Sequence, residues 1–382
     1  MTKKIAVLGA SGSVGTQALE VARARGYAVD LLTARSDYAA MESFAREFSV
    51  SSVAMADESA ARELKTRLAD TSVCVYSGEE GILEAIARTS ADTVVNSILG
   101  EAGLRPSLAT IDAGKRLALA NKESLVIVGD IVMSRARERG VEIIPVDSEH
   151  SAIFQSMKSG KSGEVKSILL TASGGPFFGK SRAELSAVTL RDTLAHPTWK
   201  MGKKITVDSA TLMNKGFEVI EAVHLFSVKP EAVRVVVHRE SILHSAVEYI
   251  DNTVIGELSV PDMRACVQYA VDYPDRCEAV IEPLDLFKIA NLSFFAPDTE
   301  AFPLLSLAGR AISDGGACPA VVNAADEVAV AAFLEEKLSF TGISDVVLRT
   351  YERMKSLATS LRTLEDIIAA DREARKIATN LI

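Results

Sequence analysis

The chain has 382 residues, 48% of them hydrophobic and 24% charged, with a formal net charge of −9 at pH 7. This length predicts two or three globular domains, and the acidic balance without a basic tract argues against nucleic acid or an anionic membrane as main partner. The four cysteines form no C-x-x-C pair, no signal-peptide pattern precedes the first strand, and no apolar run could span a bilayer, so we expect buried free thiols in a cytoplasmic protein.

A glycine-rich loop lies between the first predicted strand, residues 4–8, and a helix predicted over 16–25. Gly9, Gly12 and Gly15 give the spacing G-x-x-G-x-x-G, a variant of the dinucleotide fingerprint G-x-G-x-x-G. Glycine lets the backbone turn tightly and approach a pyrophosphate, whose charge meets free N–H groups at the helix N-terminus. The loop and its strand–helix context therefore predict nucleotide binding.

The second predicted strand, residues 29–36, indicates which dinucleotide is bound. An NAD site commonly carries an acid at the end of this strand to hold the ribose 2′-hydroxyl. Arg35 and Ser36 stand there instead and suit a 2′-phosphate, whereas Asp30 lies too early in the strand. The sequence therefore favours NADP over NAD.

Strands and helices continue to alternate up to residue 146, which is typical of a parallel sheet covered by helices. We expect strands at 53–56, 73–75, 93–98, 116–120 and 141–146, and helices at 58–68, 81–88 and 104–113. Lys122 and Glu123 follow the strand that ends at 120, at the edge where such sheets bind ligands. Two interpretations of Lys122 and Glu123 remain: they belong to a ligand site, or they form an ordinary polar turn.

The stretch from Pro145 to His150 carries the most informative pair of acids. Asp147 and Glu149 are two apart, so in an extended segment both carboxylates would point the same way. Two such anions repel each other unless a proton or a cation lies between them. Paired oxygens without nearby thiols suit Mg²⁺ or Mn²⁺. The alternative is a solvated turn with an incidental acidic pair.

Polar residues after the next predicted strand, 165–172, point to a second part of the site. Ser173 and the two glycines after it suit an anion nest or a tight turn. Residues 196–204 are polar and irregular and contain Trp199, the one tryptophan of the chain, so we expect a lid there. Asp208 or Ser209 is expected to cap a helix running to about 225.

On that predicted helix, Glu218 follows Asn214 by four residues and Lys215 by three, so the three side chains can reach the same ligand from one face of the helix. Glu218 has apolar neighbours, and a carboxylate in such company is usually paired or metal-bound. The alternative is a Lys–Glu pair on the surface.

The remaining chain predicts a second sheet and a helical end. Residues 233–238, 244–249 and 253–259 alternate like antiparallel strands, Pro261 precedes a helix, and the chain is helical from Pro303 onward. We therefore expect an α/β protein with an N-terminal Rossmann-like NADPH domain at 1–147 and a central α+β catalytic domain at 148–272. A linker at 273–298 and a C-terminal helical domain at 299–382 complete the predicted organisation.

With these residues in place, the chain resembles the 1-deoxy-D-xylulose 5-phosphate reductoisomerase family over nearly its whole length. The resemblance rests on nine motifs in order. They are GASGSVG at 9–15, NKE at 121–123, VDSEH at 146–150, SGGPF at 173–177, HPTW at 196–199, MG at 201–202, DSATLMNKG at 208–216, PDMR at 261–264 and NAADE at 323–327.

The resemblance assigns roles by position. It implies metal binding by Asp147, Glu149 and Glu218, and catalytic roles for these three and Lys122. Implied substrate contacts are Lys122, Ser148, Glu149, Ser173, His196, Trp199, Ser209, Asn214, Lys215 and Glu218. Of these, Ser173, Ser209, Asn214 and Lys215 would surround the phosphate. Implied NADPH contacts are Ser11, Gly12, Ser13, Val14, Ala34, Arg35, Ser36, Asn121, Glu123 and Gly202.

The implied reaction is a metal-assisted rearrangement of 1-deoxy-D-xylulose 5-phosphate, by retro-aldol/aldol or by a 1,2-shift, followed by hydride transfer from NADPH to give 2-C-methyl-D-erythritol 4-phosphate. The metal could be Mg²⁺ or Mn²⁺, and the resemblance implies a homodimer. Two departures stand out. Ala34 replaces a commoner glycine, and His238-Arg239-Glu240-Ser241 stands where Pro-Gln often fills the middle. We expect the second to lie away from the chemistry.

Two other functions compete with this one. A semialdehyde dehydrogenase or related NADP oxidoreductase would need a nucleophilic cysteine in the cleft, and none of the four lies in a segment with site character. A catalytically silent NADP sensor would need no set of acids such as Asp147, Glu149 and Glu218.

Overall fold

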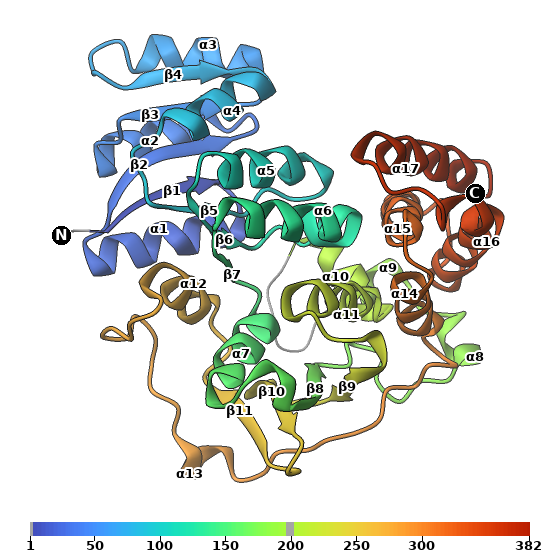
Figure 1. The fold of residues 1–382 in the computed structure, drawn as a ribbon. Helices are drawn as coiled ribbons and strands as arrows, with labels where there is room; N and C mark the ends of the chain where they lie inside the picture. The colour runs from blue at the N-terminus through green and yellow to red at the C-terminus, as the bar shows by residue number, and fades with distance from the viewer. Residues whose placement is uncertain (1–2, 196–201) are drawn as a thin grey trace. The chain divides into compact units, whose positions relative to one another are not determined.

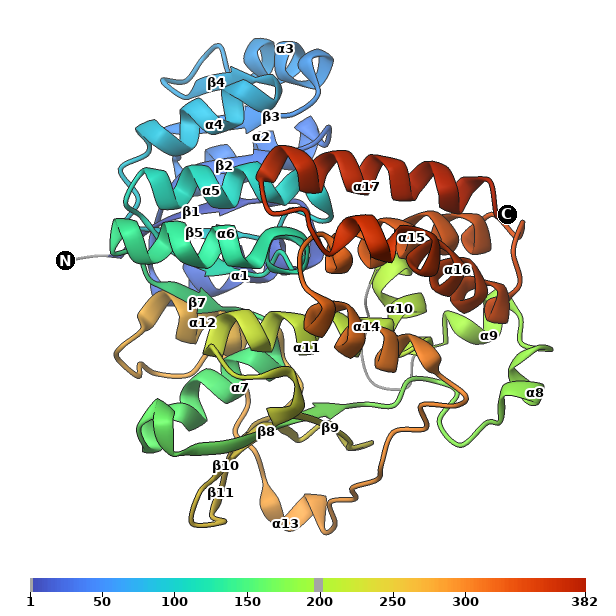
Figure 2. The ribbon, with the colours of Figure 1, turned by 45° about the vertical axis from the view of Figure 1, so that its right-hand side comes forward.

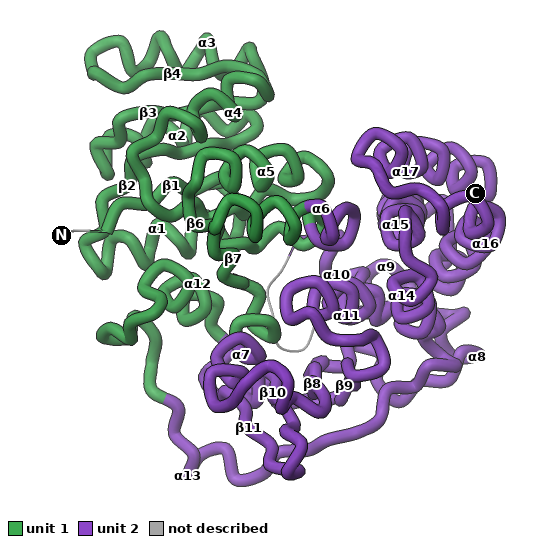
Figure 3. The backbone as a smooth tube through the Cα atoms, in the orientation of Figure 1, with its two compact units in different colours: residues 1–124, 132–151, 262–283 green, residues 125–131, 152–261, 284–382 purple. Residues whose placement is uncertain are grey.

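A computed structural model describes residues 3–195 and 202–382 of the chain. The chain divides into two compact units (Figure 3): residues 1–124, 132–151 and 262–283 form the first, and residues 125–131, 152–261 and 284–382 form the second. None of the helices within the described residues is both long and apolar enough to cross a membrane.

The first unit is built on a seven-stranded sheet in the order β4-β3-β2-β1-β5-β6-β7, and every neighbouring pair is parallel. The strands are β1 (Lys4–Leu8), β2 (Ala28–Ala34), β3 (Ser52–Met55), β4 (Cys74–Ser77), β5 (Thr93–Asn96), β6 (Arg116–Leu119) and β7 (Ile143–Pro145). Chain order reverses between β1 and β5, and ligands bind at the carboxyl ends of the strands beside such a reversal.

Helices flank this sheet (Figure 1). They are α1 (Ser13–Arg25), α2 (Tyr38–Phe48), α3 (Glu58–Arg67), α4 (Gly78–Arg88), α5 (Leu104–Asp112), α6 (Glu123–Arg139) and α12 (Met263–Asp272). Helix α7 (Ser148–Ser156) follows β7, and α6 and α7 are divided between the units. Asp37 and Asp57 begin α2 and α3 by accepting hydrogen bonds from backbone N–H groups three residues on. Continuous apolar strands such as Ile5–Leu8 are buried, as expected for a sheet covered on both faces.

The second unit holds a four-stranded sheet in the order β11-β10-β8-β9. Its strands are β8 (Val165–Ala172), β9 (Val233–Val237), β10 (Leu243–Tyr249) and β11 (Val254–Leu258). The prediction of antiparallel strands is correct for β10 with β8 and β11, but wrong for β9, which runs parallel to β8. The long connection between β8 and β9 explains this, since parallel strands need a crossover.

The helices of the second unit gather mainly toward the C-terminus. They are α8 (Arg182–Leu185), α9 (Leu190–Thr193), α10 (Lys203–Ala210), α11 (Met213–Phe226), α13 (Leu286–Ile289), α14 (Pro303–Asp314), α15 (Cys318–Leu334), α16 (Phe340–Ala358) and α17 (Leu364–Thr379). Figures 1 and 2 show α14 to α17 as one bundle, in which α15 packs against α16 and α17. The predicted helical end is confirmed.

Two local predictions are wrong, and one segment contains an element that was not expected. The helix expected from Asp208 or Ser209 to about 225 is two helices, because the chain breaks at Leu212, whose φ is +59°. The expected linker contains the short helix α13. All four cysteines are free thiols as expected, but Cys74 and Cys277 are exposed and only Cys266 and Cys318 are buried.

Candidate functional site

The glycine loop of the first unit has the close packing that a dinucleotide site requires. Gly9 has a φ of +78°, and its N–H donates to the Thr33 carbonyl at 3.0 Å, which ties the loop after β1 to β2. A Cβ on Gly15 would lie 2.2 Å from the Gly9 carbonyl oxygen, so only glycine lets α1 pack this closely on the loop. Gly12 is the N-cap of α1 and has an extended backbone, and the N-terminus of a helix is a place where a phosphate can bind.

The end of β2 carries the two residues that the sequence analysis assigned to a 2′-phosphate. Arg35 and Ser36 are exposed immediately after the strand. Asp30 is buried, and its carboxylate accepts hydrogen bonds from Ser51, Thr89 and Ser90. Burial opposes its ionisation, but these donors lower the pKa of Asp30. Asp30 therefore stabilises the fold, and Arg35 and Ser36 remain the polar pair at the strand end.

The turn after β6 combines a structural residue with a charged one. The Asn121 amide donates to the carbonyls of Ile98 and Gly100 at 2.8 and 2.9 Å and to the Glu123 carboxylate at 2.9 Å. Lys122, the next residue, places its ammonium 2.7 Å from Asp147 Oδ2. The ends of β6 and β7 therefore bring a cation and a carboxylate together, as parallel strands ending at one edge predict.

The acids at 147 and 149 differ from the prediction in one respect. Helix α7 begins at Ser148, so Asp147 precedes the helix and Glu149 lies in its first turn, and the two do not share an extended segment. Ser148 donates its hydroxyl to the Glu149 carboxylate. The oxygen-rich set fits a hard divalent cation rather than a soft one.

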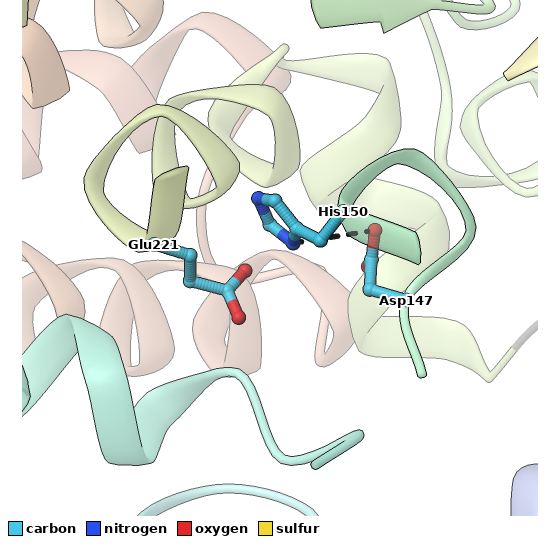
Figure 4. Close-up of side chains that lie close together, drawn as sticks. All are labelled: Asp147, His150 and Glu221. Atoms are coloured by element: carbon cyan, nitrogen blue, oxygen red, sulfur yellow. Dashed lines mark ion pairs between the residues drawn. The ribbon is translucent and has the colours of Figure 1, made fainter. Parts of the chain in front are cut away.

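His150 is a residue to which the sequence reasoning gave no role. Its ring is fully buried, and Nδ1 lies 3.6 Å from Asp147 Oδ1, the contact drawn in Figure 4. The i to i+3 spacing at a helix start places the two on one face. Asp147 Oδ2 thus accepts a hydrogen bond from the Lys122 ammonium, and Asp147 Oδ1 lies near the His150 ring. The two contacts hold the Asp147 carboxylate in one orientation. Figure 4 also draws Glu221, a buried acid on α11 of the second unit that the sequence reasoning passed over.

In the second unit, the loop after β8 forms a turn that depends on glycine. Gly174 and Gly175 have φ values of +76° and +65°, and the Gly175 N–H approaches the Ser173 hydroxyl at 3.3 Å. The Arg239 guanidinium donates to the carbonyls of Ser173 and Gly175 at 2.8 and 2.7 Å. Arg239 is therefore not remote from the candidate site, which corrects the expectation for residues 238–241. The signal for Arg239 in the sequence was that residues 238–241 depart from the family pattern.

Helices α10 and α11 carry the remaining polar residues. Glu218 is 1% exposed, accepts a hydrogen bond from the Asn214 amide at 2.6 Å, and forms an ion pair with Lys215, which is also buried. The alternative of a surface Lys–Glu pair is therefore excluded. A buried carboxylate between an amide and an ammonium on one helix face is a preformed polar centre, able to bind a cation through its oxygens or an anion through Lys215. Ser209 lies on α10, half-buried.

Two predicted substrate residues, His196 and Trp199, lie outside the described residues, as does most of the predicted lid at 196–204. Gly202 is described, and it caps the N-terminus of α10 with an extended backbone. The structure thus brings predicted site residues together within each unit. The first holds the glycine loop, the β2 end and the Lys122–Asp147 pair, and the second holds the Ser173 loop and the Asn214–Lys215–Glu218 cluster.

Three family models match the chain in succession. Residues 5–129 match "1-deoxy-D-xylulose 5-phosphate reductoisomerase", residues 143–226 match its C-terminal domain, and residues 258–377 match "DXP reductoisomerase C-terminal domain". Among curated relatives, the 1-deoxy-D-xylulose 5-phosphate reductoisomerase of Caldanaerobacter subterraneus is 47% identical over 98% of both chains. That of Acetivibrio thermocellus is 48% identical over the whole of both chains.

Solved structures agree with these matches. The reductoisomerase from Zymomonas mobilis in complex with NADPH is 42% identical and superposes with a TM-score of 0.93, covering 100% of this chain and 99% of that one. A DOX-P reductoisomerase in complex with NADPH, fosmidomycin and magnesium is 38% identical, with a TM-score of 0.92 and coverage of 99% and 98%.

Proposed function

Because this chain belongs to the 1-deoxy-D-xylulose 5-phosphate reductoisomerase family, we propose that it converts 1-deoxy-D-xylulose 5-phosphate into 2-C-methyl-D-erythritol 4-phosphate with NADPH and a divalent cation. This is an oxidoreductase reaction of isoprenoid precursor biosynthesis. The observation that carries the proposal is the end-to-end match to relatives of that name, at 47% identity over 98% of the chain, since it includes the polar groups of both units.

NADPH is assigned to the first unit. Ser11, Gly12, Ser13 and Val14 would present N–H groups at the start of α1 to the pyrophosphate. Ala34, Arg35 and Ser36 would face the adenosine end, with Arg35 on the 2′-phosphate. Asn121 and Glu123 complete the proposed contacts in this unit, and Gly202 is a proposed contact from the second unit. The tight packing of Gly15 on Gly9 supports this assignment, because it positions α1 for a phosphate.

The metal is assigned to Asp147, Glu149 and Glu218, whose hard oxygen donors suit Mg²⁺ or Mn²⁺. Bound in the site, NADPH supplies a hydride and the cation supplies Lewis-acid polarisation. Lys215 would anchor the substrate phosphate as a point charge, together with Ser173, Ser209 and Asn214. Ser148, His196 and Trp199 are further proposed substrate contacts.

Proton movement is assigned to Lys122 and Glu149. The Lys122 ammonium lies 2.7 Å from Asp147 Oδ2, so a proton held on its Nζ has a neighbouring acceptor. The contact of Asp147 with His150 orients that acceptor. We further propose that the enzyme works in the cytoplasm and, as the family resemblance implies, that it is a homodimer.

A direct assay tests the function. Purified protein is mixed with NADPH and 1-deoxy-D-xylulose 5-phosphate, and the loss of absorbance of NADPH is followed with Mg²⁺, with Mn²⁺ and with EDTA. We expect turnover with either cation and none with EDTA, and product analysis should give the branched polyol phosphate. Oxidation of NADPH that is indifferent to EDTA would contradict the metal assignment, and an absence of turnover under all conditions would contradict the function.

A further inference from the structure

A buried pair of acids in the second unit has no role in the proposed reaction. Asp208 lies on α10 and Asp326 on α15, and both are almost completely buried. The Lys204 ammonium lies 2.6 Å from Asp208 Oδ2 and 3.0 Å from Asp326 Oδ2. We call these three residues the acid-pair cluster. Two carboxylates therefore share one ammonium at the contact between α10 and α15.

The acid-pair cluster has too few hydrogen-bond donors for its carboxylate oxygens. Within the described residues, Asp208 Oδ1 and both Asp326 oxygens have no hydrogen-bond donor, apart from the ion pair with Lys204. Lys204 is partly exposed, but both carboxylates are buried, so two carboxylates and one ammonium would leave a net negative charge on buried side chains, which is unfavourable. One shared proton removes that charge and supplies the missing donor. Burial, and then the neighbouring Asp326, raise the pKa of Asp208, in agreement with this.

The cluster touches both helices that carry the proposed phosphate-binding residues. Asp208 immediately precedes Ser209 on α10. The Lys204 ammonium lies over the Phe217 ring of α11, 4.9 Å from its centroid, and Phe217 immediately precedes Glu218. Because the chain breaks at Leu212 between the two helices, their relative orientation depends on such contacts rather than on a continuous backbone.

We propose that Asp326 is a positioning residue for substrate binding. With Asp208 it forms a carboxylic acid–carboxylate pair that fixes Lys204. Lys204 in turn holds α10 and α11 in the orientation that directs Ser209, Asn214 and Lys215 at the substrate phosphate. This inference rests on the proposed function. It adds a residue from the C-terminal helical bundle, which has no other assigned part in the chemistry.

Kinetics of variants at position 326 test the positioning role. Asp326→Asn keeps the shape and offers a neutral donor in place of the acid, so it should keep the KM for 1-deoxy-D-xylulose 5-phosphate within about twofold. Asp326→Leu keeps the volume but removes the polar contact, and should raise that KM about tenfold or more, while the KM for NADPH stays unchanged. The matched control is Glu327→Gln, at the next position, whose partners are Arg375 and Asn323.

The outcomes separate the alternatives. An unchanged substrate KM in a folded Asp326→Leu protein would overturn the positioning role, as would an equal rise in Glu327→Gln. If Asp326→Asn raised the substrate KM as much as Asp326→Leu does, the shared proton would be disproved.

Infrared spectroscopy tests the proton without any turnover. The wild-type protein should show the carbonyl stretch of a buried protonated carboxylic acid, and Asp326→Asn should lack it. A band that persists in both Asp326→Asn and Asp208→Asn would contradict the inference, even if Asp326→Leu does not fold. Wild-type activity is measured first, so a protein without turnover disproves the proposed function while this spectroscopic test still stands.

Discussion

Arg35 and Ser36 stand exposed at the end of β2, where a carboxylate would reject a 2′-phosphate. We predict that Arg35→Asp weakens NADPH binding far more than NADH binding. Losing a charge-assisted hydrogen bond costs roughly 1.5–3 kcal/mol, about 10- to 150-fold in affinity. The measurement is the KM for each dinucleotide at saturating substrate. A variant that keeps the wild-type preference would show that the 2′-phosphate lies elsewhere.

Arg239 supports the turn that presents Ser173. Its two hydrogen bonds to the carbonyls of Ser173 and Gly175 hold a turn whose glycines both have positive φ. We predict that Arg239→Met, which keeps most of the packing against Phe178, raises the substrate KM about tenfold by loosening this turn. The NADPH KM should not change, since the glycine loop belongs to the other unit.

The control for this change is Arg234→Met. Arg234 is an exposed arginine on β9, and its contact is an ion pair with Glu248. A similar rise in substrate KM in both variants would mean that loss of positive charge on this unit, and not the Ser173 turn, is responsible.

At the level of elements, the sequence predicted what has a local signature. The strands of the first sheet were found because each is a short apolar run between turn residues, and the glycine loop because its spacing is specific. Helix α6 was missed because Ser124 to Gly129 are all buried, so no polar face reveals a helical period. The break at Leu212 was missed because neither glycine nor proline marks it, and tertiary packing imposes its positive φ.

The candidate site, too, could be predicted only where its residues share a local sequence pattern. Residues within one motif, such as Asn214, Lys215 and Glu218, could be grouped because helical spacing places them on one face. Asp326 and Arg239 could not, because they reach their partners from elements far apart in the chain. No periodicity encodes such contacts.

The packing of α1 on the loop after β1 gives an element-scale prediction. A methyl group at position 15 would lie 2.2 Å from the Gly9 carbonyl oxygen, so Gly15→Ala must shift α1 or the loop. Such overpacking typically costs ~1–3 kcal/mol. We expect a lower melting temperature and a loss of the stabilisation that NADPH gives the wild-type protein.

Thermal unfolding with and without NADPH measures both effects. Gly309→Ala is the control, because its new methyl group meets nothing within 4 Å and it lies within α14. It should unfold at the same or a slightly higher temperature and keep its response to NADPH. If Gly15→Ala responds to NADPH like the wild type, the close packing of α1 is not needed for the cofactor.

Across the whole molecule, the proposed reaction draws on both units. The proposed NADPH contacts lie in the first unit except for Gly202, whereas the proposed substrate contacts Ser173, Ser209, Asn214, Lys215 and Glu218 all lie in the second. The proposed metal ligands divide between them, with Asp147 and Glu149 in the first and Glu218 in the second. Binding of NADPH and binding of the metal with substrate should therefore respond separately to mutation.

Glu218→Gln tests this separation. The change keeps the shape of the side chain and its contact with Asn214, but removes one of three proposed anionic ligands and the anionic partner of the buried Lys215. Losing one of three proposed ligands weakens the cation and the Lewis-acid stabilisation that it supplies to the transition state, so we expect kcat/KM to fall by about two orders of magnitude and the metal concentration for half-maximal rate to rise sharply. The NADPH dissociation constant, measured by fluorescence titration, should match that of wild type and of Glu231→Gln, an exposed control on the same unit. If Glu218→Gln lost NADPH affinity as much as it lost kcat/KM, either the change unfolds the protein or Glu218 serves the cofactor. In a variant that stays folded, such a loss would contradict the place of Glu218 among the metal ligands.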